Sequence, residues 1–187
     1  MKAENAVGRL VETNISGKEY KAFSGAHKHS YSSKVTSLIE SLKKCGLKDG
    51  MCLSFHHQLR NGDFVILKTL EAVRELGVKD IMMAQTAMFN VHEPLIEFIK
   101  DGTVSRIEGS INGPVGDYIS RNPLPFPVVL RSHGGRWAAV KKGELKIDIA
   151  IIAASSSDER GNATGILGDN AFGPISYSQI DLSLIHI

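Results

Sequence analysis

Cysteine is scarce in this sequence, and its two cysteines form no metal-binding or disulfide pattern. Cys45 falls at the end of an expected helix and Cys52 inside an expected strand, so both should be reduced, packed thiols. The chain also has no apolar run of the roughly 20 residues that a membrane span needs. Its first ten residues contain no apolar signal segment. These absences predict a cytoplasmic protein that has no membrane partner.

The sequence also has little excess of either charge sign. The net charge of the 187 residues is +2, and no basic run or basic–aromatic stripe occurs, which argues against nucleic acid as a partner. The fractions of hydrophobic residues (42%) and charged residues (22%) are ordinary for a globular protein. A chain of this length can bury roughly 70% of its unfolded surface, enough for a core. A small anionic ligand is compatible with this composition.

Several catalytic and binding signatures are missing. The sequence contains no G-x-G-x-x-G fingerprint, no G-x-S-x-G elbow surrounds Ser132 and His133, and His56 and His57 lack the spacing of H-E-x-x-H. Neither a hydrolase triad nor a metal site is therefore predicted. The acidic residues fall at different expected corners of the fold, so the sequence assigns no catalytic carboxylate.

An alternation of strand-like and helix-like segments is present instead. Strands are predicted at residues 51–55, 80–84, 103–108, 128–130 and 146–154, and helices at 33–45, 63–76, 94–101, around 118–119 and around 137–140. This order favours right-handed crossovers, and hence the α/β class with an open parallel sheet and helices on both faces. Residues 1–29 are expected to form an arm and residues 30–180 the α/β domain.

Residues 51–63 predict a corner between a strand and a helix. An apolar run of strand length leads into a loop with His56 and His57, and the loop passes through Gly62 to Asp63, a favoured helix N-cap. Such corners lie at the carboxyl ends of parallel strands, where loop side chains and helix N-terminal N–H groups converge on ligands. The alternative is that the two histidines are loop residues that hydrogen-bond the backbone.

A second candidate site follows the expected strand at 128–130. Its loop reads Arg131-Ser132-His133-Gly134-Gly135-Arg136. Two guanidinium groups that flank a Gly-Gly pair offer side-chain and backbone donors to an anion; the alternative is a turn with solvated arginines. Residues 109–116 contain three glycines, so the backbone there can approach a ligand or turn sharply. Asn112 and Gly113 in this segment are further candidates for substrate binding. The residues alone predict an α/β domain that binds a small polyanion at its strand ends.

Four loop motifs, in the same order, resemble the alpha subunit of citrate lyase. They are SFHHQLRNGD (54–63), SINGPVG (110–116), RSHGGR (131–136) and SDERGNATG (157–165), and the resemblance covers roughly residues 21–180. It implies a CoA-transferase-like domain that exchanges acetyl for citrate on an acyl-carrier thioester, giving citryl-carrier and acetate. The implied cofactor is a CoA-type thioester, either acetyl-CoA or the dephospho-CoA-derived group of the carrier subunit, without a metal. The implied partners are the beta (lyase) and gamma (acyl-carrier) subunits.

The resemblance also implies roles for particular residues. In the wider CoA-transferase superfamily, two segments lie beside the thioester. They correspond here to the loop with His56, His57 and Gly62 and to the run with Asp158, Gly161 and Asn162. Carboxylate attack on a thioester develops oxyanion charge, which backbone N–H groups and arginines can stabilise.

Alpha chains of this family are much longer and carry a second domain of similar fold. The resemblance ends near Ile180, so residues 181–187 are expected to be a non-native or truncated tail, and this chain alone is expected to be inactive. Three alternatives stay open: another CoA-transferase, a sugar-phosphate isomerase on the same superfamily fold, or a non-catalytic module for anion binding or assembly. A preference for citrate over acetoacetate or a pentose phosphate would favour the citrate CoA-transferase.

Overall fold

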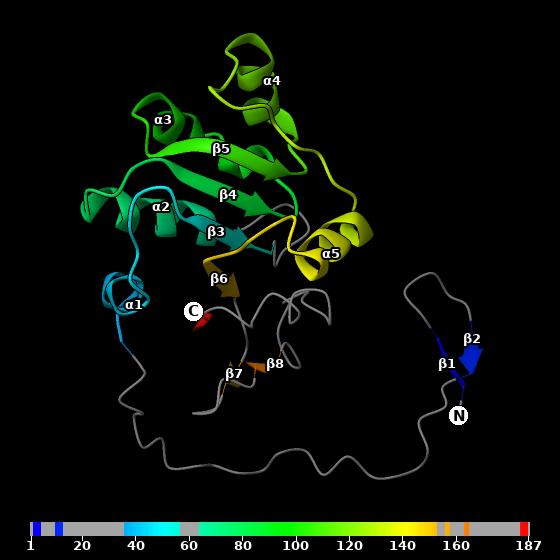
Figure 1. Cartoon of the computed structure of the whole chain (residues 1–187). Coiled ribbons are helices and arrows are strands. Elements are labelled where there is room, and N and C mark those ends of the chain that lie inside the picture. Colours follow the sequence, from blue (N-terminus) through cyan, green and yellow to red (C-terminus); the bar gives the residue numbers. More distant parts are fainter. Residues whose placement is uncertain are drawn as a thin grey trace. The chain divides into compact units, whose positions relative to one another are not determined.

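The computed structural model describes residues 36–56 and 64–152 in full. It also describes the backbones of five short strands, β1 (Lys2–Glu4), β2 (Leu10–Glu12), β7 (Ser156–Ser157), β8 (Ala163–Thr164) and β9 (Leu184–His186). The chain divides into two compact units, Met1–Ser32 and Ser33–Ile187. In the first unit β1 and β2 pair antiparallel, and the second unit contains the α/β fold (Figure 1).

The centre of the second unit is a parallel sheet. Its principal strands are β3 (Cys52–Phe55), β4 (Ile81–Gln85), β5 (Val104–Gly109) and β6 (Ile149–Ile152), and they run side by side in the order β5-β4-β3-β6 (Figure 1). All their pairings are parallel, and β9 adds to β6 in the same sense. The register aligns Glu108, Ala84, Ser54 and Ala150 in one row across the four strands. The predicted open parallel sheet is confirmed.

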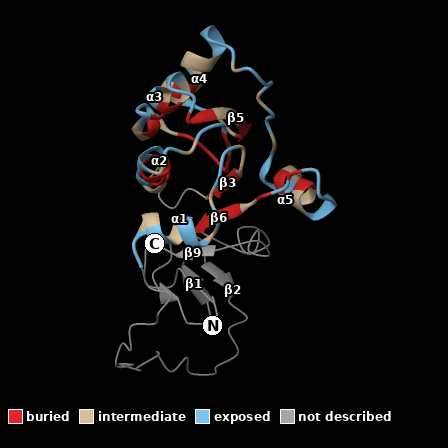
Figure 2. Ribbon diagram, turned by 60° about the vertical axis from the view of Figure 1, so that its left-hand side comes forward, coloured by how far each residue is buried: buried red, intermediate tan, exposed pale blue. Residues whose placement is uncertain are grey.

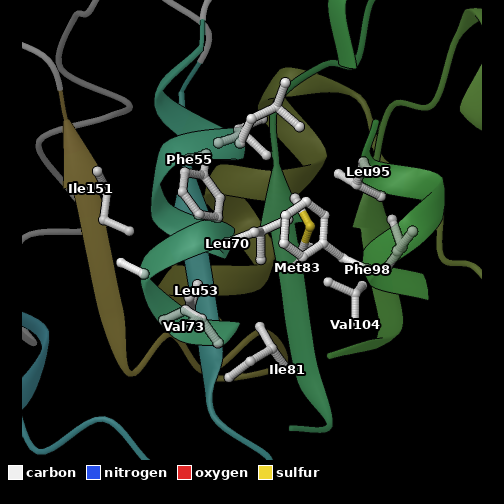
Figure 3. Packing of buried hydrophobic residues seen from close by; sticks show 14 of the residues in the cluster. Leu53, Phe55, Leu70, Val73, Ile81, Met83, Leu95, Phe98, Val104 and Ile151 are labelled. Carbon is white, nitrogen blue, oxygen red and sulfur yellow. The ribbon is translucent and has the colours of Figure 1, made fainter. Parts of the chain in front are cut away.

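Three helices bury their apolar faces against one side of this sheet. They are α1 (Leu38–Lys44), α2 (Val65–Glu75) and α3 (Leu95–Lys100). Alternate strand residues such as Leu53 and Met83 pack there against Leu70 of α2 and Phe98 of α3 (Figure 3). Each fully buried side chain of this kind contributes roughly 1.5–3 kcal/mol. Figure 2 shows the strands largely in red, because most of their residues are buried.

The other side of the sheet is lined by small residues and is covered by α5 (His133–Lys142). Cys52, Ala84 and Ala150 of the sheet pack there against Ala139 of α5. Small side chains let the helix lie close to the strands, and they leave room for a long polar side chain from the helix to reach the sheet. Helices therefore cover both faces, as the sequence predicts.

The predicted strand at residues 128–130 is wrong. Within the described ranges, this segment contacts the sheet only through an isolated parallel bridge between Glu108 and Val129. Prolines at positions 123, 125 and 127 explain the difference, because a proline cannot donate to a ladder and fixes the chain in an irregular path. The segment instead runs along the end of β5, the edge strand.

Three predicted loops or helix starts also need correction. Residues 133–136, expected to be a loop, form the first turn of α5, because the Ser132 side chain accepts a hydrogen bond from the N–H of Gly135 (3.0 Å) and caps the helix. Helix α4 (Gly113–Arg121) begins inside the expected glycine loop, with Pro114 in its first turn. Helix α2 has Phe64 as its N-cap, without a side-chain hydrogen bond, one residue after the expected Asp63.

A short 3-10 helix, η1 (Asn90–His92), completes the connection between β4 and α3. Within the described part of the chain, no helix is long and apolar enough to cross a membrane.

Candidate functional site

A pocket opens at the carboxyl ends of β4 and β5. It is lined by Gln85, Thr86, Glu108, Gly109, Arg131, Ser132, His133 and Arg136. The enclosed space is about 10 Å³, which is room for one water molecule. Four residues of the predicted anion cradle at 131–136 therefore meet the ends of two adjacent strands, the place where open α/β sheets bind ligands.

Arg136 is the buried cation of this pocket. It leaves the first turn of α5, is 3% exposed, and donates from Nη2 to the hydroxyl of Ser54 (2.8 Å) and to the carbonyl of Ala84 (2.7 Å). Burial lowers the pKa of its guanidinium to about 10, against smaller upward contributions from Cys52 and Glu108. Since a pKa of about 10 keeps the group cationic near neutral pH, α5 delivers a positive charge to the ends of β3 and β4.

Arg131 supplies the second guanidinium and lies between two carboxylates. Its Nε donates to Oε1 of Glu108, whose side chain is only 7% exposed, and its Nη1 lies 3.6 Å from Oε2 of Glu144, whose side chain is 52% exposed. Two backbone hydrogen bonds attach the segment before Arg131 to β5. The N–H of Gly109 donates to the carbonyl of Val129 (2.9 Å), and the N–H of Val129 donates to the carbonyl of Ile107 (3.3 Å).

The pocket has an excess of positive charge, because the guanidinium groups of Arg131 and Arg136 face the single carboxylate of Glu108. Charges of one sign in a cleft with low-dielectric walls attract a ligand of the other sign. Gln85 adds a polar group. It is fully buried, its Nε2 donates to the carbonyl of Ser110 (3.4 Å), and its Oε1 meets no hydrogen-bond partner within the described residues. The lining thus suits an anion that also has a donor group.

The backbone conformation at two positions of the 109–116 segment favours glycine, and the close approaches there are to the protein itself rather than to a ligand. Gly109 has φ 146°, and a Cβ at this position would lie 1.9 Å from the carbonyl oxygen of Gln85. Gly113 has φ 64°, and its Cβ would lie 2.4 Å from Oδ1 of Asn90. Both close approaches are to the protein's own chain. Asn112 is exposed and holds the N-cap position of α4 without a side-chain capping bond, and its Nδ2 donates to the hydroxyl of Ser110 (3.4 Å). Neither Asn112 nor Gly113 lines the pocket.

The other predicted site residues are placed as follows. Gly134 and Gly135 lie in the first turn of α5, where Gly134 is exposed, with no atom within 4 Å of a Cβ built on it. His56 is half-buried and directly follows β3. His57, Gly62, Asp158, Gly161 and Asn162 lie outside the described residues. Their assignments stay predictions.

Sequence reasoning missed Gln85, Thr86 and Ser54, and it left Glu108 unassigned. One signal could have found most of them, because Gln85, Thr86 and Glu108 stand at or just after the end of a correctly predicted strand. In a parallel sheet these positions meet at a single edge. Ser54 required knowledge of which face α5 covers.

The two cysteines lie away from the pocket lining. Cys52 is buried at the start of β3, and burial raises the pKa of its thiol to about 12, with Arg136 opposing this effect, so the thiol stays protonated. Cys45 is half-buried at the end of α1. Within the described ranges, no group of three histidine, cysteine or acidic residues is arranged to hold a metal ion.

An open parallel sheet with a cationic pocket at its carboxyl edge defines an α/β protein whose strand-end site is suited to a small anion. Comparison with known families identifies the family to which the chain is similar. Residues 32–186 match the family model described as "Citrate lyase, alpha subunit (CitF)". The chain belongs to the citrate lyase alpha-subunit family, the CoA-transferase component of citrate lyase. The resemblance drawn from the four loop motifs is confirmed.

Related proteins agree with this family. The chain is 43% identical over 147 residues to the citrate lyase alpha chain of Haemophilus influenzae and 40% identical over 146 residues to that of Escherichia coli. Each match spans 78% of this chain but 29% of the relative. A crystal structure described as the alpha subunit of citrate lyase from Streptococcus mutans in complex with citrate matches with a TM-score of 0.69 and 43% identity, over 74% of this chain and 28% of that one. The chain thus spans less than a third of the length of these relatives.

Proposed function

We propose that this chain binds a carboxylate of citrate in the pocket at the ends of β4 and β5 and acts as part of a citrate CoA-transferase. The observation that carries the proposal is the meeting of Arg131 and Arg136, from one loop-to-helix segment, with the strand ends at Gln85 and Glu108. Guanidinium groups are the preferred partners of carboxylates in proteins because their geometry is complementary. The relative from Streptococcus mutans, described in complex with citrate, supports the choice of anion.

The proposed reaction exchanges the acetyl group of an acyl-carrier thioester for citrate, so that citryl-carrier and acetate are formed. The thioester supplies the activated acyl group, either as acetyl-CoA or as the dephospho-CoA-derived group of the gamma subunit. The described residues bind and orient the attacking carboxylate, and the Arg131 guanidinium offsets the negative charge that develops at the reacting carbonyl. The exposed turn at Gly134 leaves backbone near the pocket open to a ligand.

The thioester side of the site is proposed to lie at two segments outside the described residues. The first is the loop that follows His56 and contains His57 and Gly62. The second is the run that contains Asp158, Gly161 and Asn162. Both belong to the motifs that carry the family resemblance, and His56 directly follows β3, the strand next to β4 in the sheet.

We further propose that acyl transfer belongs to the full-length alpha chain. The relatives are more than three times longer than the part that this chain matches, and a transferase must hold a carboxylate and a thioester together. The beta (lyase) and gamma (acyl-carrier) subunits are the proposed partners, and the cytoplasm is the proposed compartment. On this proposal the 187 residues bind citrate without turning it over.

Calorimetric titration of this chain tests the ligand. Citrate, acetoacetate and ribose 5-phosphate are titrated in turn. Citrate is expected to bind at least about tenfold more tightly than either competitor, because its further carboxylates are also attracted by the excess positive charge of the pocket. Arg131→Gln should weaken citrate binding by a similar factor. The matched control is Arg121→Gln, which removes an exposed arginine from the last turn of α4. Tighter binding of the sugar phosphate would favour the isomerase alternative, and no binding of any of the three would overturn the proposal.

A further inference from the structure

We propose that Glu108 is a built-in carboxylate that occupies the binding position on Arg131, and that a ligand carboxylate must displace it. This inference rests on the proposed function, because it names what stands in the citrate site before citrate arrives. Glu108 acts through Arg131 and is therefore a positioning residue.

Glu108 and Arg131 form an ion pair whose acidic partner is buried. Glu108 is 5% exposed as a residue and lies in β5, on the face that α5 covers, in the row that continues through Ala84 and Ser54. Its Oε1 accepts the hydrogen bond from Nε of Arg131. The side chain of Glu108 is 7% exposed and that of Arg131 is 25% exposed, so water screens the pair only in part. A charge-assisted hydrogen bond is stronger than a neutral one, and the guanidinium cannot offer its Nε edge to a second carboxylate at the same time.

Space in the pocket is small. With the pair formed it is about 10 Å³, which is room for one water molecule. A carboxylate group is larger than a water molecule, so none fits beside Glu108. A ligand that pairs with the inner edge of Arg131 must therefore take the position that the Glu108 carboxylate holds.

Backbone hydrogen bonds hold the segments that carry both partners in place. The bridge between Glu108 and Val129 and the hydrogen bond from Gly109 to Val129 (2.9 Å) fix the chain two residues before Arg131. The guanidinium is thus preorganised at the strand end, so exchange of one carboxylate for another needs only side-chain movement. The free energy of ligand binding then depends on how much more strongly the ligand carboxylate interacts with Arg131 than Glu108 does.

Glu144 offers a matched control for Glu108, because it contacts the same arginine from outside the pocket. The side chain of Glu144 is 52% exposed, its Oε2 lies 3.6 Å from Nη1 of Arg131, and it does not line the pocket. An exposed pair of this kind is screened by water and is weak. Removing the charge of Glu108 and removing that of Glu144 therefore separate an inner competitor from a general electrostatic effect on the same arginine.

The first experiment needs no ligand. The chain is treated with phenylglyoxal, which modifies accessible guanidinium groups, and the rate at Arg131 is followed by peptide mass spectrometry. Glu108→Gln should raise that rate about tenfold, the factor expected when one charge-assisted hydrogen bond is lost. Glu144→Gln should change it less than about twofold. An unchanged or slower rate in Glu108→Gln would overturn the inference.

The second experiment adds citrate. Glu108→Gln should bind citrate about tenfold more tightly than wild type, because the internal competitor has lost its charge. A purely structural Glu108 predicts the reverse, weaker binding together with lower stability, and that result would also overturn the inference. Glu108→Asp covers the case in which Glu108→Gln does not fold. It keeps the charge but shortens the side chain, and it should move both readouts in the same direction by a smaller factor.

The two readouts distinguish this inference from the proposed function. If Glu108→Gln exposes Arg131 to phenylglyoxal but citrate neither binds nor protects that arginine, Glu108 stands as the masking carboxylate and citrate is overturned as the ligand. If citrate protects Arg131 equally well in wild type and in Glu108→Gln, citrate stands as the ligand and displacement of Glu108 is overturned.

Discussion

The guanidinium of Arg136 hydrogen-bonds the hydroxyl of Ser54, with 2.8 Å between Nη2 and Oγ, across 82 positions of sequence. The same Nη2 donates to the carbonyl of Ala84 in the neighbouring strand. One buried cation thus ties the first turn of α5 to both β3 and β4. This tie fixes the position of the α5 N-terminus, and with it Arg131 and Ser132, relative to the strand ends.

A double-mutant cycle tests this tie. Ser54→Ala and Arg136→Met should each lower the free energy of unfolding by about 1–3 kcal/mol, because each removes a buried hydrogen bond that involves a charged group. The double variant should lose at least about 1 kcal/mol less than the sum, since residues in contact couple. Urea denaturation provides the four values. Additive losses would mean that the Ser54 hydroxyl and Arg136 act independently.

A second prediction concerns Gly109 at the end of β5. Gly109→Ala should lower the free energy of unfolding by several kcal/mol, because its Cβ would lie 1.9 Å from the backbone oxygen of Gln85, which cannot move without breaking the sheet. The control is Gly102→Ala, also at a positive φ (77°) but with nothing within 4 Å, which should cost only about 1 kcal/mol. Equal losses in the two variants would contradict the close approach at the pocket wall.

The thiol of Cys52 predicts a pH effect. Its pKa is raised by burial from 9.0 to about 12, so between these values the folded chain keeps a proton that the unfolded chain has lost. The stabilisation that the protonated thiol gives to the folded state is complete below pH 9. As the pH rises toward 12, the free energy of unfolding falls by about 1.4 kcal/mol per pH unit. Unfolding of wild type and Cys52→Ala is compared from pH 8 to about 10.5, with Cys45→Ala as control. Parallel pH curves for wild type and Cys52→Ala would show that the buried thiol titrates normally.

A fourth prediction separates binding from catalysis. The 187-residue chain should bind citrate yet give no citrate-dependent loss of acetyl-CoA, because a carboxylate held without a positioned thioester lacks the roughly 7–11 kcal/mol that positioning contributes to such reactions. The assay follows acetyl-CoA by chromatography after cooperative unfolding of the sample has been confirmed. A turnover equal to that of a full-length alpha chain would place the whole active site within these residues.

Much of the fold could be predicted because its signals are local. The helices α1, α2 and α3 end just before Gly46, Gly77 and Gly102, which have φ of 72°, 71° and 77°, the conformation that glycine adopts most easily. The apolar runs that became β3, β4, β5 and β6 have strand length, and β3 and β4 lie between these helices while β5 and β6 follow α3. Periodicity and stop signals therefore define most elements without any tertiary information.

The two errors have different causes. Gly134 and Gly135 predict a turn, but the Ser132 cap and the packing of Ala139 on the sheet make the segment helical, and the packing on the sheet cannot be read from the local sequence. The apolar residues at 128–130 predict a strand, but the prolines before them prevent one. This second error could have been avoided, because the prolines lie in the same stretch of sequence.

The candidate site could be predicted only in part, for a related reason. The position of Arg131 and Arg136 at a strand end follows from the order of elements, and both do line the pocket. Their partners do not follow, because Glu108 lies 23 positions from Arg131 and Ser54 lies 82 positions from Arg136. These pairs depend on the register of three parallel strands and on which face α5 covers, and neither is encoded in any single segment.

The proposed binding of citrate through Arg131, at the ends of β4 and β5 where Glu108 now stands, is tested most directly by a crystal structure of this chain with citrate bound. It should show a citrate carboxylate within hydrogen-bonding distance of the Arg131 guanidinium, with the Glu108 side chain turned away from Nε. Citrate bound elsewhere on the chain, or citrate bound while the pair of Glu108 and Arg131 stays intact, would contradict the claim.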